Sequence, residues 1–262
     1  MSLANLTKDV LIFTDLDGTL LDHNSYRFDE ASMMLDYLKA HRIPLIIVTS
    51  KTKNEVIRLQ KLLGIEMPFI IENGGGILIP SKGGYETITM GYDYKAIRQA
   101  FERYAQIVPM RGFFDMRAEE IAACTNLPLE QATDAKERLF TEPFMLEDET
   151  ALDLLREMAD NDGLSIVKGG RFYHLITKGQ DKAAAIRYLI KYFQDASGRT
   201  FKTVALGDSA NDLSMLQSVD TPILIPHPDG SYLPCDIPHL IKASSPGPRG
   251  WNAALKRYFH VQ

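Results

Sequence analysis

The sequence predicts an α/β fold, in which a doubly wound, mostly parallel sheet carries an inserted α+β domain. Short apolar runs alternate with amphipathic helical segments before residue 84 and again after residue 172. Between them, longer and more charged helical segments mix with strands. Acidic clusters follow two of the apolar runs, at the sheet edge where open α/β folds bind ligands. We therefore expect a core of residues 1–84 and 172–262 and a cap of residues 85–171.

The first part of the expected core alternates strand and helix. The run 10–14 is short, apolar and rich in β-forming residues, as in a buried strand. Apolar residues share one face of a helix over about 29–41, and 43–49 is the second strand. Thr52-Lys53-Asn54-Glu55 is a capping-box pattern, which predicts a helix that ends at Gly64. A third strand is expected at 69–71, and the alternation favours parallel pairing.

Glycine runs at 74–76 and 83–84 interrupt this rhythm and mark the start of the expected cap. The cap is expected to end near Gly169-Gly170. Its predicted helices cover about 93–108, 117–125, 129–140 and 148–160. The alternative is that these residues continue one larger sheet.

After the cap the α/β rhythm returns. We expect a strand at 173–177, a helix at 181–193 and a strand at 202–206. The composition of 244–248 predicts a loop, and a closing helix follows over about 249–259.

Two acidic clusters stand at the ends of predicted strands. Asp15 and Asp17 lie two residues apart after the first strand and therefore project in the same direction, and Gly18 allows the backbone to turn sharply. Asp208 and Asp212 follow the strand at 202–206. A turn signal and a helix cap are the structural alternatives for these residues. Together the clusters indicate one magnesium site built from both ends of the core.

Four segments resemble, in order, the motifs of haloacid dehalogenase-like phosphatases. They are Asp15-Leu16-Asp17-Gly18-Thr19, the strand that ends in Thr49, Lys182, and Gly207-Asp208-Ser209-Ala210-Asn211-Asp212. Further runs resemble the mannosyl-3-phosphoglycerate phosphatase branch: 48–52, 72–76, 169–174 and 246–252. One departure is Thr125-Asn126-Leu127, where Thr-Gly-Leu is expected. The resemblance implies a Rossmann-like core with a cap between the second and third motifs.

The resemblance also implies roles for the acids. Asp15 would be the nucleophile, forming an aspartyl-phosphate, and its second oxygen would bind Mg²⁺. Asp17 would protonate the leaving oxygen, then take a proton from water, and its backbone carbonyl would be a metal ligand. Asp208 would complete the metal site.

A phosphate group needs positive charge and hydrogen-bond donors around it. The residues expected to bind or orient the phosphate are Thr49, Ser50, Asn211 and Asp212. Lys182 opens a helix, where a lysine opposes the dipole, which indicates a role beyond solvation. We expect Lys182 to neutralise the phosphate and pair with Asp212. Lys178 is the competing lysine, which the family spacing disfavours.

Substrate-binding residues are harder to assign, because each candidate also has a structural reading. The candidates are Asn73, Gly74, Arg138, Arg171 and His174. Arg171 and His174 could meet a carboxylate and a sugar hydroxyl, or Arg171 could simply be exposed. The remaining histidines considered lack metal-ligand spacing and are expected to be structural: His23, His41, His227 and His260.

Composition excludes several classes of protein. The 262 residues suit two domains, and an apolar content of 45% supports an ordinary core. A net charge of −5 argues against a nucleic-acid-binding protein. Cys124 and Cys235 are widely spaced, which indicates reduced thiols and a cytoplasmic location. No apolar run approaches the ~20 residues that span a bilayer. The sequence does not specify the oligomeric state.

The expected function is a Mg²⁺-dependent phosphomonoester hydrolase. Its substrate is a small phosphorylated sugar or glycerate, with mannosyl-3-phosphoglycerate or glucosyl-3-phosphoglycerate favoured by the resemblance. A broader phosphatase for sucrose, trehalose or hexose phosphates is the alternative. A phosphomutase or a non-catalytic binding module on the same scaffold also remains open.

Overall fold

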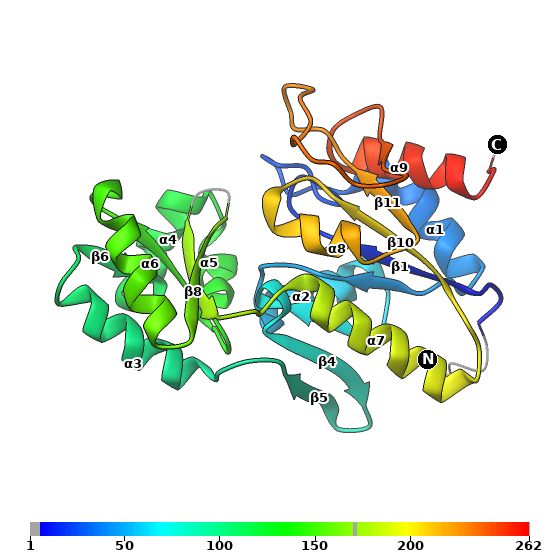
Figure 1. The fold of residues 1–262 in the computed structure, drawn as a ribbon. Helices are drawn as coiled ribbons and strands as arrows, with labels where there is room; N and C mark the ends of the chain where they lie inside the picture. Colours follow the sequence, from blue (N-terminus) through cyan, green and yellow to red (C-terminus); the bar gives the residue numbers. More distant parts are fainter. Residues whose placement is uncertain (1–5, 170–171, 262) are drawn as a thin grey trace.

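The computed structural model describes residues 6–169 and 172–261. Figure 1 shows two lobes joined by two segments of chain, with the middle third of the sequence forming the smaller lobe. The larger lobe contains both ends of the described chain and is called the core lobe below; the smaller one is called the cap lobe.

A five-stranded parallel sheet forms the centre of the core lobe, in the order β12-β11-β10-β1-β2. Its strands are β1 (Val10–Thr14), β2 (Leu45–Ile47), β10 (Lys202–Gly207), β11 (Thr221–Leu224) and β12 (Ile241–Lys242). β1 and β10 are adjacent although most of the sequence, including the whole cap, lies between them. This pairing brings the two predicted acidic clusters to the same edge.

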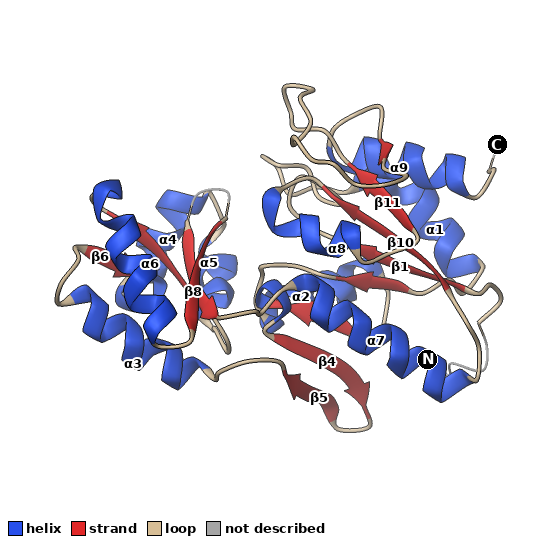
Figure 2. Ribbon diagram, viewed as in Figure 1, coloured by secondary structure: helices blue, strands red, loops and turns tan. Residues whose placement is uncertain are grey.

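Helices cover both faces of this sheet, as the doubly wound prediction requires (Figure 2). One face packs against α1 (Ser32–Ala40), α2 (Lys53–Leu63) and α9 (Gly247–Tyr258). The other packs against α7 (Lys182–Ser197) and α8 (Leu213–Gln217). Trp251 in α9 is fully buried, and its indole NH donates to the Thr14 hydroxyl at the end of β1.

The local signals for α2 are confirmed. Thr52 is the N-cap and forms a capping box with Glu55, and Gly64 ends the helix at φ +62°. The left-handed backbone at that position favours glycine.

A hairpin extends the core lobe beyond β2. β3 (Phe69–Ile71), β4 (Gly76–Ser81) and β5 (Gly84–Thr89) form an antiparallel sheet, and a single parallel bridge joins Val48 to Ile70. β5 pairs with β4 and is therefore part of the core lobe, although the sequence analysis assigned residues from 85 onward to the cap. The hairpin turns at Lys82 and Gly83, and Gly84 begins β5, so these glycines lie within the hairpin and not at a domain boundary.

The cap lobe contains a four-stranded antiparallel sheet in the order β6-β7-β9-β8. The strands are β6 (Met110–Gly112), β7 (Glu142–Leu146), β8 (Leu164–Lys168) and β9 (Tyr173–Thr177). α3 (Tyr94–Ala105) and α6 (Leu152–Asn161) cover one face, and α4 (Ala118–Thr125) and α5 (Leu129–Lys136) pack with Phe113 and Met116 in a second cluster.

The expectation that strand 173–177 belongs to the core was wrong. β9 is a central strand of the cap sheet, where it pairs with β7 and β8. A short apolar strand does not reveal which sheet it joins, because either interior would bury it. We propose that the cap runs from about residue 91 to residue 180, which keeps the three-part division and moves its limits.

None of the described helices is both long and apolar enough to cross a membrane.

Candidate active site

The candidate site lies at the carboxyl ends of β1 and β10, in the middle of the core sheet. Asp15 follows β1 directly, and Asp208 follows β10. Gly18 has φ +82°, and a Cβ there would lie 2.5 Å from Oδ2 of Asp208. Two constraints therefore favour glycine at this position: the backbone is left-handed, and the Asp208 carboxylate occupies the space that a Cβ would need.

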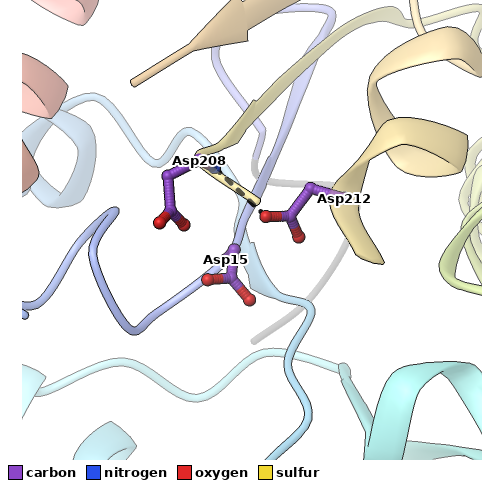
Figure 3. A group of neighbouring side chains, drawn as sticks. All are labelled: Asp15, Asp208 and Asp212. Carbon is purple, nitrogen blue, oxygen red and sulfur yellow. Dashed lines mark hydrogen bonds between the residues drawn. The ribbon is translucent and has the colours of Figure 1, made fainter. Parts of the chain in front are cut away.

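Three carboxylates come together at this edge (Figure 3). Asp15, Asp208 and Asp212 each offer an oxygen atom, and these atoms all lie within 4.8 Å of one another. The Thr19 hydroxyl donates to Asp208 at 3.0 Å. Asp212 accepts from the backbone NH groups of Asp208 and Ser209 through Oδ2, which holds the loop after β10 in place.

Lys182 lies between two of these acids. Its Nζ is 2.7 Å from Oδ1 of Asp15 and 2.6 Å from Oδ1 of Asp212, and its side chain has no exposed surface. Burial alone lowers the pKa of Lys182, but the two carboxylates together raise it above its ordinary value. Lys178, the competing lysine, is about half exposed and pairs with Asp160 on α6. The structure thus brings Lys182, and not Lys178, to the acids.

The acids carry more negative charge than Lys182 can neutralise. Burial, followed by the charge of Asp212, raises the pKa of Asp15 to about 7 despite Lys182. Burial, followed by the charges of Asp212 and Asp15, raises the pKa of Asp208 to about 8. Buried carboxylates that resist ionisation in this way are stabilised by an added cation.

The donor set fits a divalent cation. Hard cations such as Mg²⁺ bind carboxylate and carbonyl oxygens, and the three clustered oxygens are of that type. Asp17 is not in this cluster: its Oδ2 lies 2.9 Å from Nζ of Lys51, while its Oδ1 is buried without a described partner. The resemblance described above implies metal binding by the Asp17 backbone carbonyl and proton transfer by its side chain, and neither role requires the side chain to join the cluster.

Of the residues expected around the phosphate, Ser50 and Asn211 line the cleft described below, whereas Thr49 is not among the described lining residues. The Thr49 hydroxyl is buried and accepts from the backbone NH of Lys51 at 3.2 Å. The Ser50 carbonyl accepts from Arg138. The Asn211 amide donates to Asn73 at 3.1 Å.

A cleft of about 460 Å³ opens above the carboxylates, between the two lobes. Its core side includes Asp15, Asp17, Lys51, Glu55 and Asp208, and its cap side includes Phe113, Leu127, Arg138, Phe172 and His174. The acids therefore form the polar end of a cavity that is large enough for a small ligand.

Two of the cap-side candidates, Arg138 and His174, do line this cleft. Arg138 is held by the Ser50 carbonyl, by Thr141 and by the buried carboxylate of Glu72. Burial, and then the charge of Arg138, lowers the pKa of His174 to about 3, so the imidazole is neutral. Its Nδ1 is buried without a described partner, which leaves a polar atom for a ligand hydroxyl.

The other substrate-binding candidates differ in outcome. Asn73 and Gly74 are buried and are not among the described residues that line the cleft. A Cβ on Gly74 would lie 2.1 Å from the Asp181 carbonyl, so this glycine allows the backbone to pack closely against the start of α7. Arg171 lies outside the described residues.

Sequence reasoning missed four polar residues at or beside the cleft. Lys51 follows the strand-end Thr49-Ser50 pair, which is the signal that could have identified it. Glu72 accepts from three successive backbone NH groups at 139–141 and so ties the cap chain to the core, a contact with no local signal. His227 lines the cleft and contacts the Asp208 carbonyl, and His23 lines it too, although both were expected to be structural only.

Comparison with known sequences gives consistent results. Residues 8–229 match the model of the family described as sucrose-6F-phosphate phosphohydrolase. A glucosyl-3-phosphoglycerate/mannosyl-3-phosphoglycerate phosphatase of Persephonella marina is 48% identical over 259 residues, covering 95% of this chain and 96% of the relative. A phosphatase with the same description from Methanococcoides burtonii is 41% identical over 261 residues, covering 94% and 95%.

Solved structures show the same fold at low sequence identity. Thermoplasma acidophilum 0175 superposes with a TM-score of 0.72 at 18% identity, covering 97% of this chain and 100% of that one. A haloalkanoate dehalogenase-superfamily phosphatase of Bacteroides thetaiotaomicron gives 0.68 at 16% identity, covering 97% and 96%. These matches cover both lobes, so the core and the cap occur together in known proteins.

Proposed function

This chain belongs to the haloacid dehalogenase-like phosphatases, in the mannosyl-3-phosphoglycerate phosphatase family, and from this premise we propose that it removes the phosphate from mannosyl-3-phosphoglycerate or glucosyl-3-phosphoglycerate. The products are the glycosylglycerate and inorganic phosphate. The observation that carries the proposal is the buried group of Asp15, Lys182 and Asp208 at the floor of a cleft between core and cap.

The carboxylates of Asp15 and Asp208, with the backbone carbonyl of Asp17, would hold Mg²⁺. When bound, the ion offsets negative charge on the phosphate and on the attacking group. Lys182 contributes a fixed positive charge beside Asp15, and Asp212 holds the Lys182 amine in place. Phosphate monoesters hydrolyse so slowly in water that the catalyst must lower the barrier by about 20 kcal/mol or more. Several such contributions are therefore needed.

The reaction proceeds in two displacements. In the first, an Asp15 carboxylate oxygen forms a bond to phosphorus as the ester P–O bond breaks, and Asp17 gives its proton to the leaving alkoxide. In the second, water attacks phosphorus, the bond to Asp15 breaks, and Asp17 takes the proton from that water. The cap closes the cleft over the glycosyl and glycerate groups and limits the access of bulk water.

A broader sugar-phosphate phosphatase is the second candidate. The family description that matches residues 8–229 names a sucrose phosphate, which favours this alternative specifically. A phosphomutase would use the same first acids but would yield an isomeric phosphate ester.

The cellular setting is part of the same proposal. We propose a cytoplasmic location and a small phosphorylated sugar or glycerate as partner. The chain's two cysteines, Cys124 and Cys235, are far apart in the sequence, which supports the location.

The decisive experiment compares kcat/KM for a panel of phosphate esters with Mg²⁺ present. Mannosyl- or glucosyl-3-phosphoglycerate should exceed sucrose 6-phosphate and simple hexose phosphates, with inorganic phosphate as the product. Asp15→Asn should lower turnover at least about 1,000-fold while the protein stays folded, because the nucleophile is lost.

Equal rates for hexose phosphates would overturn the narrow substrate assignment and leave the broader one. An aryl-phosphate assay with and without a chelator tests the hydrolase itself: no chelator-sensitive activity would indicate a binding module.

A further inference from the structure

Lys51 is a cleft residue to which the reaction above gives no role. It lies between Ser50 and Thr52, the N-cap of α2, at the core side of the cleft. Its side chain is only 14% exposed. A lysine this buried at the mouth of a polar site is unusual unless its charge is used.

Neighbours from three parts of the chain hold the Lys51 amine. Nζ lies 2.9 Å from Oδ2 of Asp17, 3.6 Å from Oε1 of Glu55 and 5.1 Å from the centre of the Tyr26 ring. Glu55 is itself fixed, because its Oε2 accepts from the backbone NH of Thr52 at 2.9 Å in the capping box. An ammonium group has three donors, so Lys51 can keep this position and still bind a ligand anion.

Lys51 is also the cation best placed to serve a ligand. Arg138 is the other lysine or arginine among the described residues that line the cleft, and its guanidinium is engaged by Glu72, Thr141 and the Ser50 carbonyl. Lys182 is fully buried between Asp15 and Asp212. An anionic group on the substrate, apart from the phosphate, therefore has Lys51 as its nearest available partner on the core side.

The position of Lys51 indicates which part of the substrate it meets. In the proposed reaction Asp17 contacts the leaving oxygen, and Lys51 contacts Asp17. The leaving group of a glycosyl-3-phosphoglycerate is the glycosylglycerate, and the oxygen that leaves belongs to its three-carbon glycerate unit. Its carboxylate is therefore close to the oxygen that Asp17 protonates. Sucrose and hexose phosphates have no carboxylate at that place.

We propose that Lys51 is the specificity residue that binds the carboxylate on the glycerate unit of the leaving group. The site thereby selects phosphate esters of a carboxylated alcohol over those of an uncharged sugar. This inference rests on the proposed function and assigns its substrate preference to one side chain. A charge-assisted hydrogen bond of this kind changes kcat/KM by roughly 10- to 100-fold.

The test compares glucosyl-3-phosphoglycerate with its carboxamide analogue, which keeps the size of the group but removes its charge. Wild type should favour the carboxylate by about 10- to 100-fold in kcat/KM. Lys51→Met should bring this ratio close to one. Any fall in kcat/KM that results from the lost contact with Asp17 affects both substrates equally and cancels in the ratio. Lys51→Arg, which keeps the charge, should retain most of the preference, and Lys51→Gln is a second neutral variant with a donor for Asp17.

Lys61→Met is the matched control, because Lys61 is an exposed lysine on α2, the helix that follows Lys51, and is outside the described cleft lining. It should keep the wild-type ratio. If Lys51→Met and Lys51→Gln lower both rates by the same factor, Lys51 only positions Asp17 and the inference is overturned. If wild type hydrolyses the carboxamide equally well, the inference fails while the proposed function stands. If wild type prefers hexose phosphates to both compounds, the proposed function fails as well.

Discussion

At the scale of single residues, the site is governed by charge balance around Lys182. One fully buried ammonium contacts two carboxylates, and a third carboxylate, Asp208, lies close by. Breaking a buried pair by removing one partner costs about 3–5 kcal/mol, because the remaining charge stays buried without compensation.

Lys182→Met should therefore lower the free energy of unfolding by about 3–5 kcal/mol and reduce kcat at least about 100-fold. Denaturant unfolding and steady-state kinetics with Mg²⁺ measure the two effects. Lys178→Met is the matched control, since it breaks an exposed pair with Asp160. That variant should change stability by no more than about 0.5 kcal/mol and leave kcat unchanged. A comparable loss of activity in Lys178→Met would contradict the assignment of Lys182.

Much of this residue pattern could be predicted from the sequence, because the acids follow strands directly and the strand ends meet at one edge. Lys51 could not be assigned in this way. A lysine next to a helix N-cap is normally solvated, and only the fold shows Asp17, Glu55 and Tyr26 around it.

At the scale of elements, α7 shows how a helix start positions a catalytic group. Asp181 is the N-cap and accepts from the backbone NH of Ala184 at 2.7 Å, and Lys182 is the first helical residue. Gly74, at φ +90°, packs directly beneath this start. The position of Lys182 therefore depends on a glycine in a distant segment.

Gly74→Ala should displace the start of α7, because the new Cβ would lie 2.1 Å from the Asp181 carbonyl and the backbone conformation disfavours alanine. We expect a loss of about 2–4 kcal/mol in unfolding free energy and a lower kcat, measured by denaturation and by aryl-phosphate hydrolysis. Gly83→Ala is the control: it lies in the β4–β5 turn, where a Cβ meets nothing within 4 Å. Wild-type behaviour of Gly74→Ala would show that α7 does not rely on this contact.

Element types and the capping signals of α2 could be predicted, whereas strand partners could not. β9 was identified as a strand but assigned to the wrong sheet, because its apolar sequence suits either interior. The β4–β5 hairpin was missed, since its second strand is largely exposed and the glycines at its turn resembled a boundary.

At the scale of the whole molecule, contacts between α2 and α5 hold the lobes around the cleft. Arg58 on α2 pairs with Glu130 and Asp134 on α5, and the Thr52 hydroxyl donates to the Asp134 carbonyl. Partners so far apart in the sequence leave no local pattern. The sequence therefore predicted that a cap exists but not how it sits on the core.

The free energy of unfolding should depend on pH through the carboxylates of the proposed metal site. Asp15 and Asp208 have raised pKa values in the folded state, about 7 and about 8, so the folded protein binds more protons than the unfolded chain above about pH 4. Their contribution to stability is present below that pH and is lost as pH rises toward 8. The lowered pKa of His174 acts in the opposite direction. Its contribution to stability is lost as the pH falls below 6.5, the ordinary pKa of histidine, toward about 3.

A comparison of wild type with Asp208→Asn separates these contributions, because His174 is common to both. Without metal, wild type should lose stability relative to Asp208→Asn between about pH 5 and pH 8, since only wild type must ionise Asp208. Added Mg²⁺ binds the ionised carboxylates and should raise Tm of wild type more at pH 8 than at pH 5, by linkage. Asp208→Asn should lose most of that rise, and Asp36→Asn, which removes an exposed carboxylate, should keep it. An equal Mg²⁺ effect on Tm in wild type and Asp208→Asn at pH 8 would place the ion elsewhere and remove the basis for the metal site proposed at the ends of β1 and β10.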